Sequence, residues 1–279
     1  MKRQVQVCNG VGHVYFRVMA DKPLILVCND DGITAPGIKV LVERMQKLGK
    51  VVVVAPDSPQ SGMGHAITIN HPLRLVEMDY FGKDVLAYQC SGTPADCVKL
   101  AVDKVLHRNP DLLVSGINHG SNSSINILYS GTMSAAMEGA IEGMNAIGFS
   151  LQDYSYHADF SVAAEVVDVV AANVLNNGLP PDTLLNVNIP KVTREELKGI
   201  KVCRQARAKW EEEFDERVDP YGRNYYWLTG EFQQLDHGED TDEWALKNGY
   251  ASVVPVQFDL TAHHAIGTLN TWELNEEIK

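Results

Sequence analysis

Two adjacent carboxylates follow the first strongly apolar segment of the chain. Residues 24–28 form a run of five apolar side chains, and Asn29, Asp30, Asp31 and Gly32 come directly after it. A short continuous apolar run is typical of a strand buried on both faces of a parallel sheet. Ligands gather beyond the carboxyl ends of such strands. Asp30 and Asp31 are therefore candidates for catalysis or metal binding, although an acidic turn would contain the same residue types.

Two later apolar runs also lead into polar loops. The run 51–54 precedes residues 55–65, in which Ser61 is the main functional candidate and Asp57 the second, although an isolated serine there could be a turn hydroxyl. The run 111–115 precedes residues 116–124, which include Asn118. Because the carboxyl ends of parallel strands meet at one edge of a sheet, we expect these side chains to lie near Asp30 and Asp31.

The chemistry of this set favours a hard cation and a phosphate ester. Carboxylate, hydroxyl and amide oxygens suit Mg²⁺, Mn²⁺ or Ca²⁺ better than zinc, which prefers His and Cys. Segments 29–37, 56–65 and 115–132 contain no Lys or Arg, so a metal and backbone dipoles would have to meet the charge of a phosphate. A bound divalent ion can polarise a phosphoryl oxygen and generate a nucleophile from water. The set therefore predicts metal-assisted phosphate-ester hydrolysis.

Two helix entries offer backbone N–H groups to an anion. Ser130, Gly131 and Thr132 lead into a small-residue helix from Met133, and such an entry can hold a phosphate without a lysine. An ordinary capping turn is the alternative; with Asn118 nearby in the sequence, we favour phosphate binding. Thr93 opens another helix, and there we favour a structural cap.

The elements that position these residues alternate between strand and helix. Apolar runs predict strands at 24–28, 51–54, 66–78, 84–90, 111–115, 146–151, 184–189 and 250–258, with helices between several of them. We expect an α/β fold: a Rossmann-like, mostly parallel sheet with helices on both faces, plus a C-terminal hairpin or arm.

Residues 22–279 are predicted to be one domain, preceded by an extension at 1–21. Charged and aromatic residues dominate about 205–247, which we interpret as an arm for contact between subunits, although a solvated hairpin would have a similar composition. Residues 1–18 are expected to be dispensable, with Met19 as the working start. An added edge strand is the rival interpretation.

Composition narrows the class of protein. The chain has 279 residues, of which 45% are hydrophobic and 22% charged, and a net charge of −12. This charge argues against a nucleic-acid duplex or an anionic membrane as partner, and no apolar run is long enough to span a bilayer. The five cysteines include no Cys-x-x-Cys pair, which indicates reduced thiols in a cytosolic protein.

Five motifs resemble, in order, the signatures of the SurE survival-protein family; they lie at 26–37, 54–62, 92–98, 110–118 and 129–132. The resemblance implies a cytoplasmic, metal-dependent 5′/3′-nucleotidase with a Rossmann-like core that acts on nucleoside monophosphates. The family's metal ligands fall on Asp30, Asp31, Ser61 and Asn118. One divalent ion, Mg²⁺ or Mn²⁺, and a homodimer or homotetramer are implied. Residues 252–256 depart from the family's usual Ser-x-Thr-Pro-Leu.

Two other functions compete with this interpretation. A haloacid-dehalogenase-like phosphatase needs Asp-x-Asp, whereas Asp30 and Asp31 are adjacent. A non-catalytic nucleotide-binding module would explain the helix entries but not the paired aspartates. We expect Asp30, Asp31 and Asn118 to be catalytic, and Asn118, Ser130, Gly131 and Thr132 to bind phosphate. The general acid stays open between His65 and His119.

Overall fold

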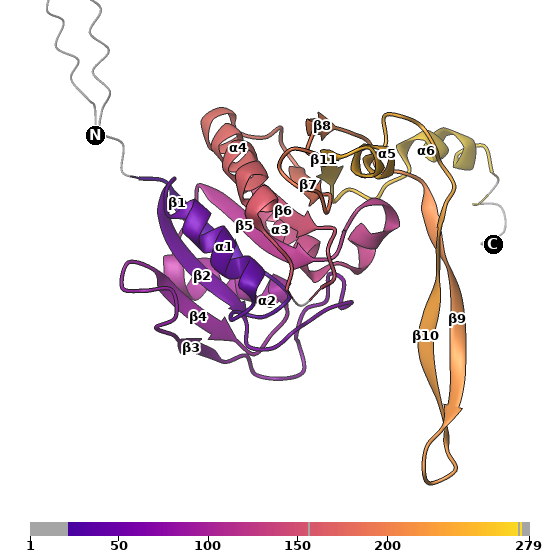
Figure 1. Ribbon diagram of the computed structural model, residues 1–279, viewed down its shortest axis with the longest axis horizontal. Coiled ribbons are helices and arrows are strands. Elements are labelled where there is room, and N and C mark those ends of the chain that lie inside the picture. Colours follow the sequence, from indigo (N-terminus) through magenta and orange to yellow (C-terminus); the bar gives the residue numbers. More distant parts are fainter. Residues whose placement is uncertain (1–21, 156, 273, 275–279) are drawn as a thin grey trace, which may run out of the picture.

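The computed structural model describes residues 22–155, 157–272 and 274, whose main feature is a sheet flanked by helices (Figure 1). Six of its strands are parallel. In spatial order they are β4 (Leu86–Cys90), β2 (Lys50–Pro56), β1 (Leu24–Cys28), β5 (Leu112–His119), β6 (Ala146–Leu151) and β7 (Thr183–Ile189). This arrangement confirms the expected α/β class.

Short or antiparallel strands complete the two edges of the sheet. On one side, β3 (Leu75–Glu77) runs antiparallel to β4. On the other side, β11 (Tyr250–Gln257) runs antiparallel to β7, and β8 (Gly199–Val202) runs parallel to β11. The described residues thus form a nine-stranded mixed sheet.

The order in which the chain adds strands to the sheet reverses between β1 and β5, which are neighbouring parallel strands. From β1 it proceeds outward through β2 to β4, and then returns to place β5 on the other side of β1. Val27 of β1 is in register with Val53 of β2 and with Val114 of β5. In an open α/β sheet such a switch point leaves a crevice at the carboxyl ends of the two central strands. Asp30 and Asp31 follow β1 at this crevice.

Alternation along β1 builds one core on each face of the sheet, because successive side chains point to opposite faces. Ile25 and Val27 belong to the core covered by α1 (Pro36–Met45) and α4 (Ser161–Asn177). Leu26 and Cys28 belong to the other core, with α2 (Pro94–Leu100) and α3 (Gly131–Ile141). The expected helices on both faces are present.

The remaining helical segments are short. A π-helical segment (Ala101–Leu106) continues α2, and a 3₁₀ helix, η2 (Ser124–Tyr129), precedes α3. Near the C-terminal end lie α5 (Asp242–Lys247) and α6 (His263–Leu269). Within the described part of the chain, no helix combines the length and apolarity that crossing a membrane requires.

A long two-stranded hairpin projects from the body (Figure 1). It consists of β9 (Ala208–Val218) and β10 (Asn224–Gln234), which pair in antiparallel register from Gln234–Ala208 to Asn224–Val218. Most of its side chains are exposed, including Phe214 and Trp227. The aromatic and charged segment predicted as an arm is therefore a hairpin that has little contact with the rest of this chain.

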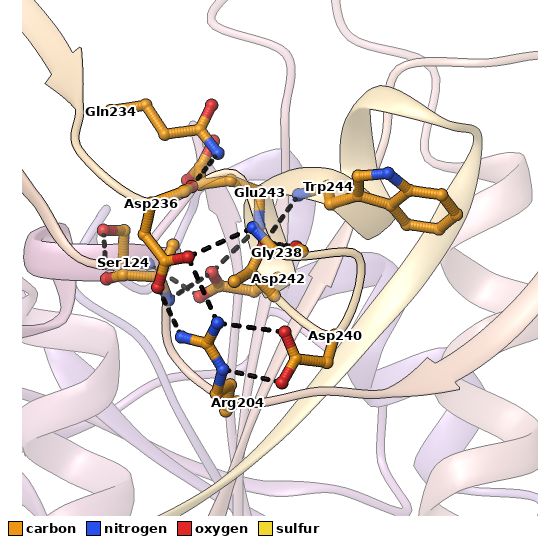
Figure 2. Close-up of polar contacts among 11 residues, drawn as sticks. Ser124, Arg204, Gln234, Asp236, Gly238, Asp240, Asp242, Glu243 and Trp244 are labelled. Carbon is orange, nitrogen blue, oxygen red and sulfur yellow. Dashed lines mark hydrogen bonds and ion pairs between the residues drawn. The ribbon is translucent and has the colours of Figure 1, made fainter.

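Ion pairs fasten the base of the hairpin (Figure 2). The Arg204 guanidinium donates to both carboxylate oxygens of Asp240 and to Asp236. The neighbouring Asp242 is fully buried and accepts hydrogen bonds from the backbone N–H groups of Ser124, at 2.8 Å, and Ala206, at 2.9 Å. Because Ser124 opens η2, these contacts connect the hairpin base to the segment that leads into α3.

Three sequence predictions about elements need correction. Only Leu75–Glu77 of the predicted strand 66–78 is a strand, because the preceding residues are mostly exposed and include Pro72. The strand predicted at 84–90 begins at Leu86. The strand predicted to end at Ser115 continues to His119, so Asn118 lies in β5 and not in the following loop.

Two predictions concern the cysteines and the N-terminal extension. Cys28, Cys90, Cys97 and Cys203 are buried and free, as expected for reduced thiols, whereas Cys8 lies outside the described residues. The extension at 1–21, with its dispensable residues 1–18, also lies outside them.

Candidate metal and phosphate site

A polar cavity of about 200 Å³ opens at the switch point of the sheet. Its walls come from the ends of β1, β2 and β5 and the loops that follow them, from the loop after β6, and from η2 and the entry to α3. The predicted residues that line it are Asp30, Ser61, Asn118 and Ser130, and His119 joins them. The structure therefore brings together side chains from four separated segments of the sequence, as the strand-end pattern predicted.

Asp30 is the most enclosed acidic group of this site, with only 4% of its surface exposed. The Thr132 hydroxyl donates a hydrogen bond to Asp30 Oδ1. A Cβ atom at Gly131 would lie 2.6 Å from Asp30 Cβ, so a residue without a side chain is needed there. Burial raises the pKa of Asp30 to about 6, and the Asp31 carboxylate adds to this rise.

Asp31 points toward the end of β5. Its Oδ2 accepts a hydrogen bond of 3.2 Å from the His119 backbone N–H and lies 3.4 Å from His119 Nδ1. The His119 and Phe160 rings also meet edge to face, with 5.1 Å between ring centroids. Asp31 is not among the residues that line the polar cavity, although its charge raises the pKa of the neighbouring Asp30 and its carboxylate contacts His119.

The loop after β2 carries Ser61 across the end of β1. The Gln60 backbone N–H donates to the Asp30 carbonyl oxygen at 2.8 Å, and the Gly64 N–H donates to the Tyr129 carbonyl at 3.3 Å. These two bonds flank Ser61 and tie its loop to β1 on one side and to η2 on the other. The exposed Ser61 hydroxyl is thereby held at the rim of the cavity.

Asn118 presents an oxygen because its amide nitrogen is already used. Asn118 Nδ2 donates to the Gly120 carbonyl at 2.8 Å. The register of β5 against β6 shifts between Ser115 and Asn118, and such a bulge re-aims the side chains beside it. Close packing supports this segment, since a Cβ atom on Gly37 of α1 would lie 2.0 Å from the Ile117 carbonyl oxygen.

Of the phosphate ligands predicted at the entry to α3, one lines the polar cavity and two do not. Ser130 lines the cavity, and its Oγ accepts from the Met133 N–H at 3.0 Å, so this serine caps the helix. Gly131 and Thr132 lie behind it against Asp30. The N–H groups of the first turn remain the means by which this helix can bind an anion.

A divalent cation fits this set of donors. Among the described residues, no basic side chain forms an ion pair with Asp30, whose buried carboxylate lies next to a second one. The buried Oδ1 of Asn29, which precedes Asp30, has no hydrogen-bond partner. The described residues contain no cluster of three His, Cys, Asp or Glu that could hold a metal, because two of the four oxygen donors here are a hydroxyl and an amide.

Sequence reasoning missed several lining residues. Asn122, Asn126, Tyr129 and Tyr154 also contribute to the polar cavity. The polar run from Asn118 to Ser124 was the available signal for the first of these. Tyr154 comes from the loop after β6, where nothing in the sequence pattern indicated a site.

Comparison with known proteins shows the family to which this sequence belongs. The sequence model of the family described as "Survival protein SurE" matches residues 25–212. The chain belongs to the SurE family. A relative named 5′-nucleotidase SurE from Flavobacterium psychrophilum is 64% identical, over 91% of this chain and 99% of the relative. A relative of the same name from Christiangramia forsetii is 65% identical, over 91% and 98%.

A crystal structure from the SurE family extends the likeness to the fold. The SurE protein from Aquifex aeolicus superposes with a TM-score of 0.77 at 43% sequence identity, and the match covers 89% of this chain and 98% of that one. Membership of the SurE family thus confirms the resemblance inferred from the five motifs.

Proposed function

We propose that this protein is a 5′-nucleotidase that depends on one divalent metal ion, Mg²⁺ or Mn²⁺, and releases phosphate from nucleoside monophosphates. One observation carries the proposal: the Asp30 carboxylate is buried beside Asp31 at the switch point, without a basic partner among the described residues. The names of the SurE relatives support the choice of substrate.

Asp30, Asp31, Ser61 and Asn118 would hold the ion. When bound, it would polarise a phosphoryl oxygen and lower the pKa of a water molecule. The N–H groups at the entry to α3 and the Ser130 hydroxyl would orient the phosphate. Water adds to phosphorus, the bond between phosphorus and the ester oxygen breaks, and the nucleoside leaves with a proton.

Of the two candidate histidines, His119 is the one that can contact a substrate in this cavity. It lines the cavity and contacts Asp31. The His65 ring instead lies 2.9 Å from Glu138 and is not among the lining residues.

We also propose a homodimer or homotetramer that uses the hairpin β9–β10 as its contact arm. Large exposed aromatic side chains on a segment without its own core support this proposal. A cytoplasmic location agrees with the free buried thiols and with the family resemblance.

Phosphate release by the purified protein tests the enzymatic proposal. AMP, GMP, CMP, UMP and adenosine 3′-monophosphate would each be offered with Mg²⁺, with Mn²⁺ and with excess EDTA. We expect release from the 5′-monophosphates that EDTA abolishes and added metal restores, with thermal melting as the control for folding. Equal release in EDTA, or none with either metal, would overturn the proposal; the 3′-ester decides whether both positions are accepted.

A further inference from the structure

A second cavity, of about 360 Å³, lies between the base of the hairpin and the end of η2. Its lining surface is mostly apolar and comes from Tyr129, Trp210, Glu212, Leu228, Thr229 and Gly230. Tyr129 lines both this apolar cavity and the polar cavity that contains Asp30. The two cavities are therefore neighbours that share one wall.

Strand register explains why the hairpin is hollowed at this point. Glu212 of β9 lies opposite Gly230 of β10, and Trp210 lies opposite Phe232. Residues 210 and 212 share one face of β9, and residues 228, 230 and 232 share one face of β10. Gly230 contributes only backbone opposite Glu212, which leaves room between the larger side chains.

Hydrogen bonds fix the hairpin side of the apolar cavity relative to the polar cavity. The Trp210 indole N–H donates to Asn126 Oδ1 at 2.8 Å, and Asn126 lines the polar cavity. Trp210 also meets Phe232 edge to face, with 5.6 Å between ring centroids. Together with the contacts of buried Asp242 to both segments (Figure 2), these bonds join the hairpin base to η2.

We propose that the apolar cavity binds the nucleobase of the substrate while the phosphate occupies the polar cavity. This inference rests on the proposed nucleotidase function. Tyr129 is 51% exposed and Trp210 is 39% exposed, so both present ring surface on which a flat base can stack. Neither side chain would need to leave a packed core to do so.

The charge of the lining disfavours a second anionic group and favours hydrogen-bond donors. Among the described residues that line the apolar cavity, Glu212 is the one charged side chain, and it can only accept hydrogen bonds. A second phosphate or carboxylate would be repelled there, whereas the amino and ring N–H groups of a base are hydrogen-bond donors. A nucleoside monophosphate, anionic at one end and flat and apolar at the other, matches the two joined cavities.

The test compares an ester that carries a base with one that does not. We would measure kcat/KM for AMP and for ribose 5-phosphate in the wild type, Tyr129→Leu and Tyr129→Phe. Stacking on one aromatic ring predicts that Tyr129→Leu lowers the ratio of the two values by about tenfold, and that Tyr129→Phe keeps it. Because a ratio is used, a loss of folded protein or of bound metal lowers both values alike.

Tyr225→Leu is the matched control. Tyr225 is 40% exposed on the same hairpin and lines neither cavity, so we expect its ratio to equal that of the wild type. An unchanged ratio in Tyr129→Leu, or an equal fall in Tyr225→Leu, would overturn the inference.

Binding of adenosine, measured by calorimetry, needs no turnover and separates the two hypotheses. We expect adenosine to bind the wild type and to bind Tyr129→Leu about tenfold more weakly. If adenosine binds in this way but no ester is hydrolysed, the nucleotidase proposal fails and the base site stands. If AMP is hydrolysed but adenosine does not bind, the base site is wrong.

Discussion

The imidazole of His65 lies 2.9 Å from the buried carboxylate of Glu138, and this contact joins the loop that carries Ser61 to helix α3. Glu138 is 3% exposed and also pairs with Lys99 of α2. Burial alone would raise the pKa of Glu138, but the hydrogen bonds from His65 and Lys99 hold it below its ordinary value of 4.5. A depressed carboxyl pKa stabilises the folded state above that ordinary value, and the stabilisation is lost as the pH falls below it.

We therefore predict that Glu138→Gln lowers the free energy of unfolding by about 1–3 kcal/mol at neutral pH, since it removes a charge from two partners. The loss should shrink in acid, where the wild-type carboxyl is protonated as well. Urea unfolding at pH values on either side of the titration measures this. Glu142→Gln, at an exposed position at the end of the same helix, is the control. An equal loss at every pH would contradict the ion-pair explanation.

Asp30 should behave in the opposite way in the metal-free protein. Its pKa is raised from 3.8 to about 6, so the folded state is penalised above about pH 6 and unpenalised below the unfolded value of 3.8. Asp30→Asn keeps an acceptor for Thr132 and removes the charge. We predict that it raises the free energy of unfolding by roughly 1–3 kcal/mol at pH 7 in EDTA. Thermal melting would show this; a lower melting temperature would mean that burial of the charge is not the dominant effect.

Gly131 should tolerate no side chain. An added Cβ would lie 2.6 Å from Asp30 Cβ, so Gly131→Ala must displace either Asp30 or the entry to α3. We predict a loss of about 1–3 kcal/mol in stability together with reduced AMP turnover. Gly267→Ala on α6, where nothing lies within 4 Å of the new Cβ, should leave both unchanged or raise stability slightly. Wild-type turnover in Gly131→Ala would argue against this close contact.

The exposed aromatic residues of the hairpin should determine assembly. Phe214 and Trp227 are 68% and 59% exposed, and their burial between subunits would account for large apolar side chains on a projecting arm. We predict that the double variant Phe214→Ser and Trp227→Ser has a smaller mass by light scattering than the wild type. Ile69→Ser, at a 79% exposed position on the body, should not change the mass. An identical mass for the folded double variant would contradict an arm made by these residues.

The sequence predicted the centre of the fold better than its periphery. The predicted strands Leu24–Cys28 and Ala146–Leu151 have those bounds in the structure, because strands covered on both faces need mostly apolar residues along their length. Residues 66–74 contain apolar residues too, but they form no strand. Pairing with a neighbouring strand is not visible in one segment alone.

The sequence likewise predicted the centre of the candidate site but not the residues around it. Strand ends and missing basic residues indicated Asp30, Ser61 and Asn118, which line one cavity. The Thr132 hydroxyl, by contrast, bonds Asp30, 102 positions earlier in the sequence. The apolar cavity lined by Tyr129 and Trp210 depends on where the hairpin base lies, which no local pattern specifies.

The central claim is that paired carboxylates and a divalent ion make this protein a nucleotidase. The most direct measurement is the rate of phosphate release from AMP at saturating Mn²⁺ for Asp31→Asn against Asp57→Asn. Asp57 is exposed in the neighbouring loop and does not line the polar cavity. We predict that Asp31→Asn lowers kcat by at least about a hundredfold, while Asp57→Asn stays near the wild type. Full activity in Asp31→Asn, or in the wild type with excess EDTA, would contradict the account.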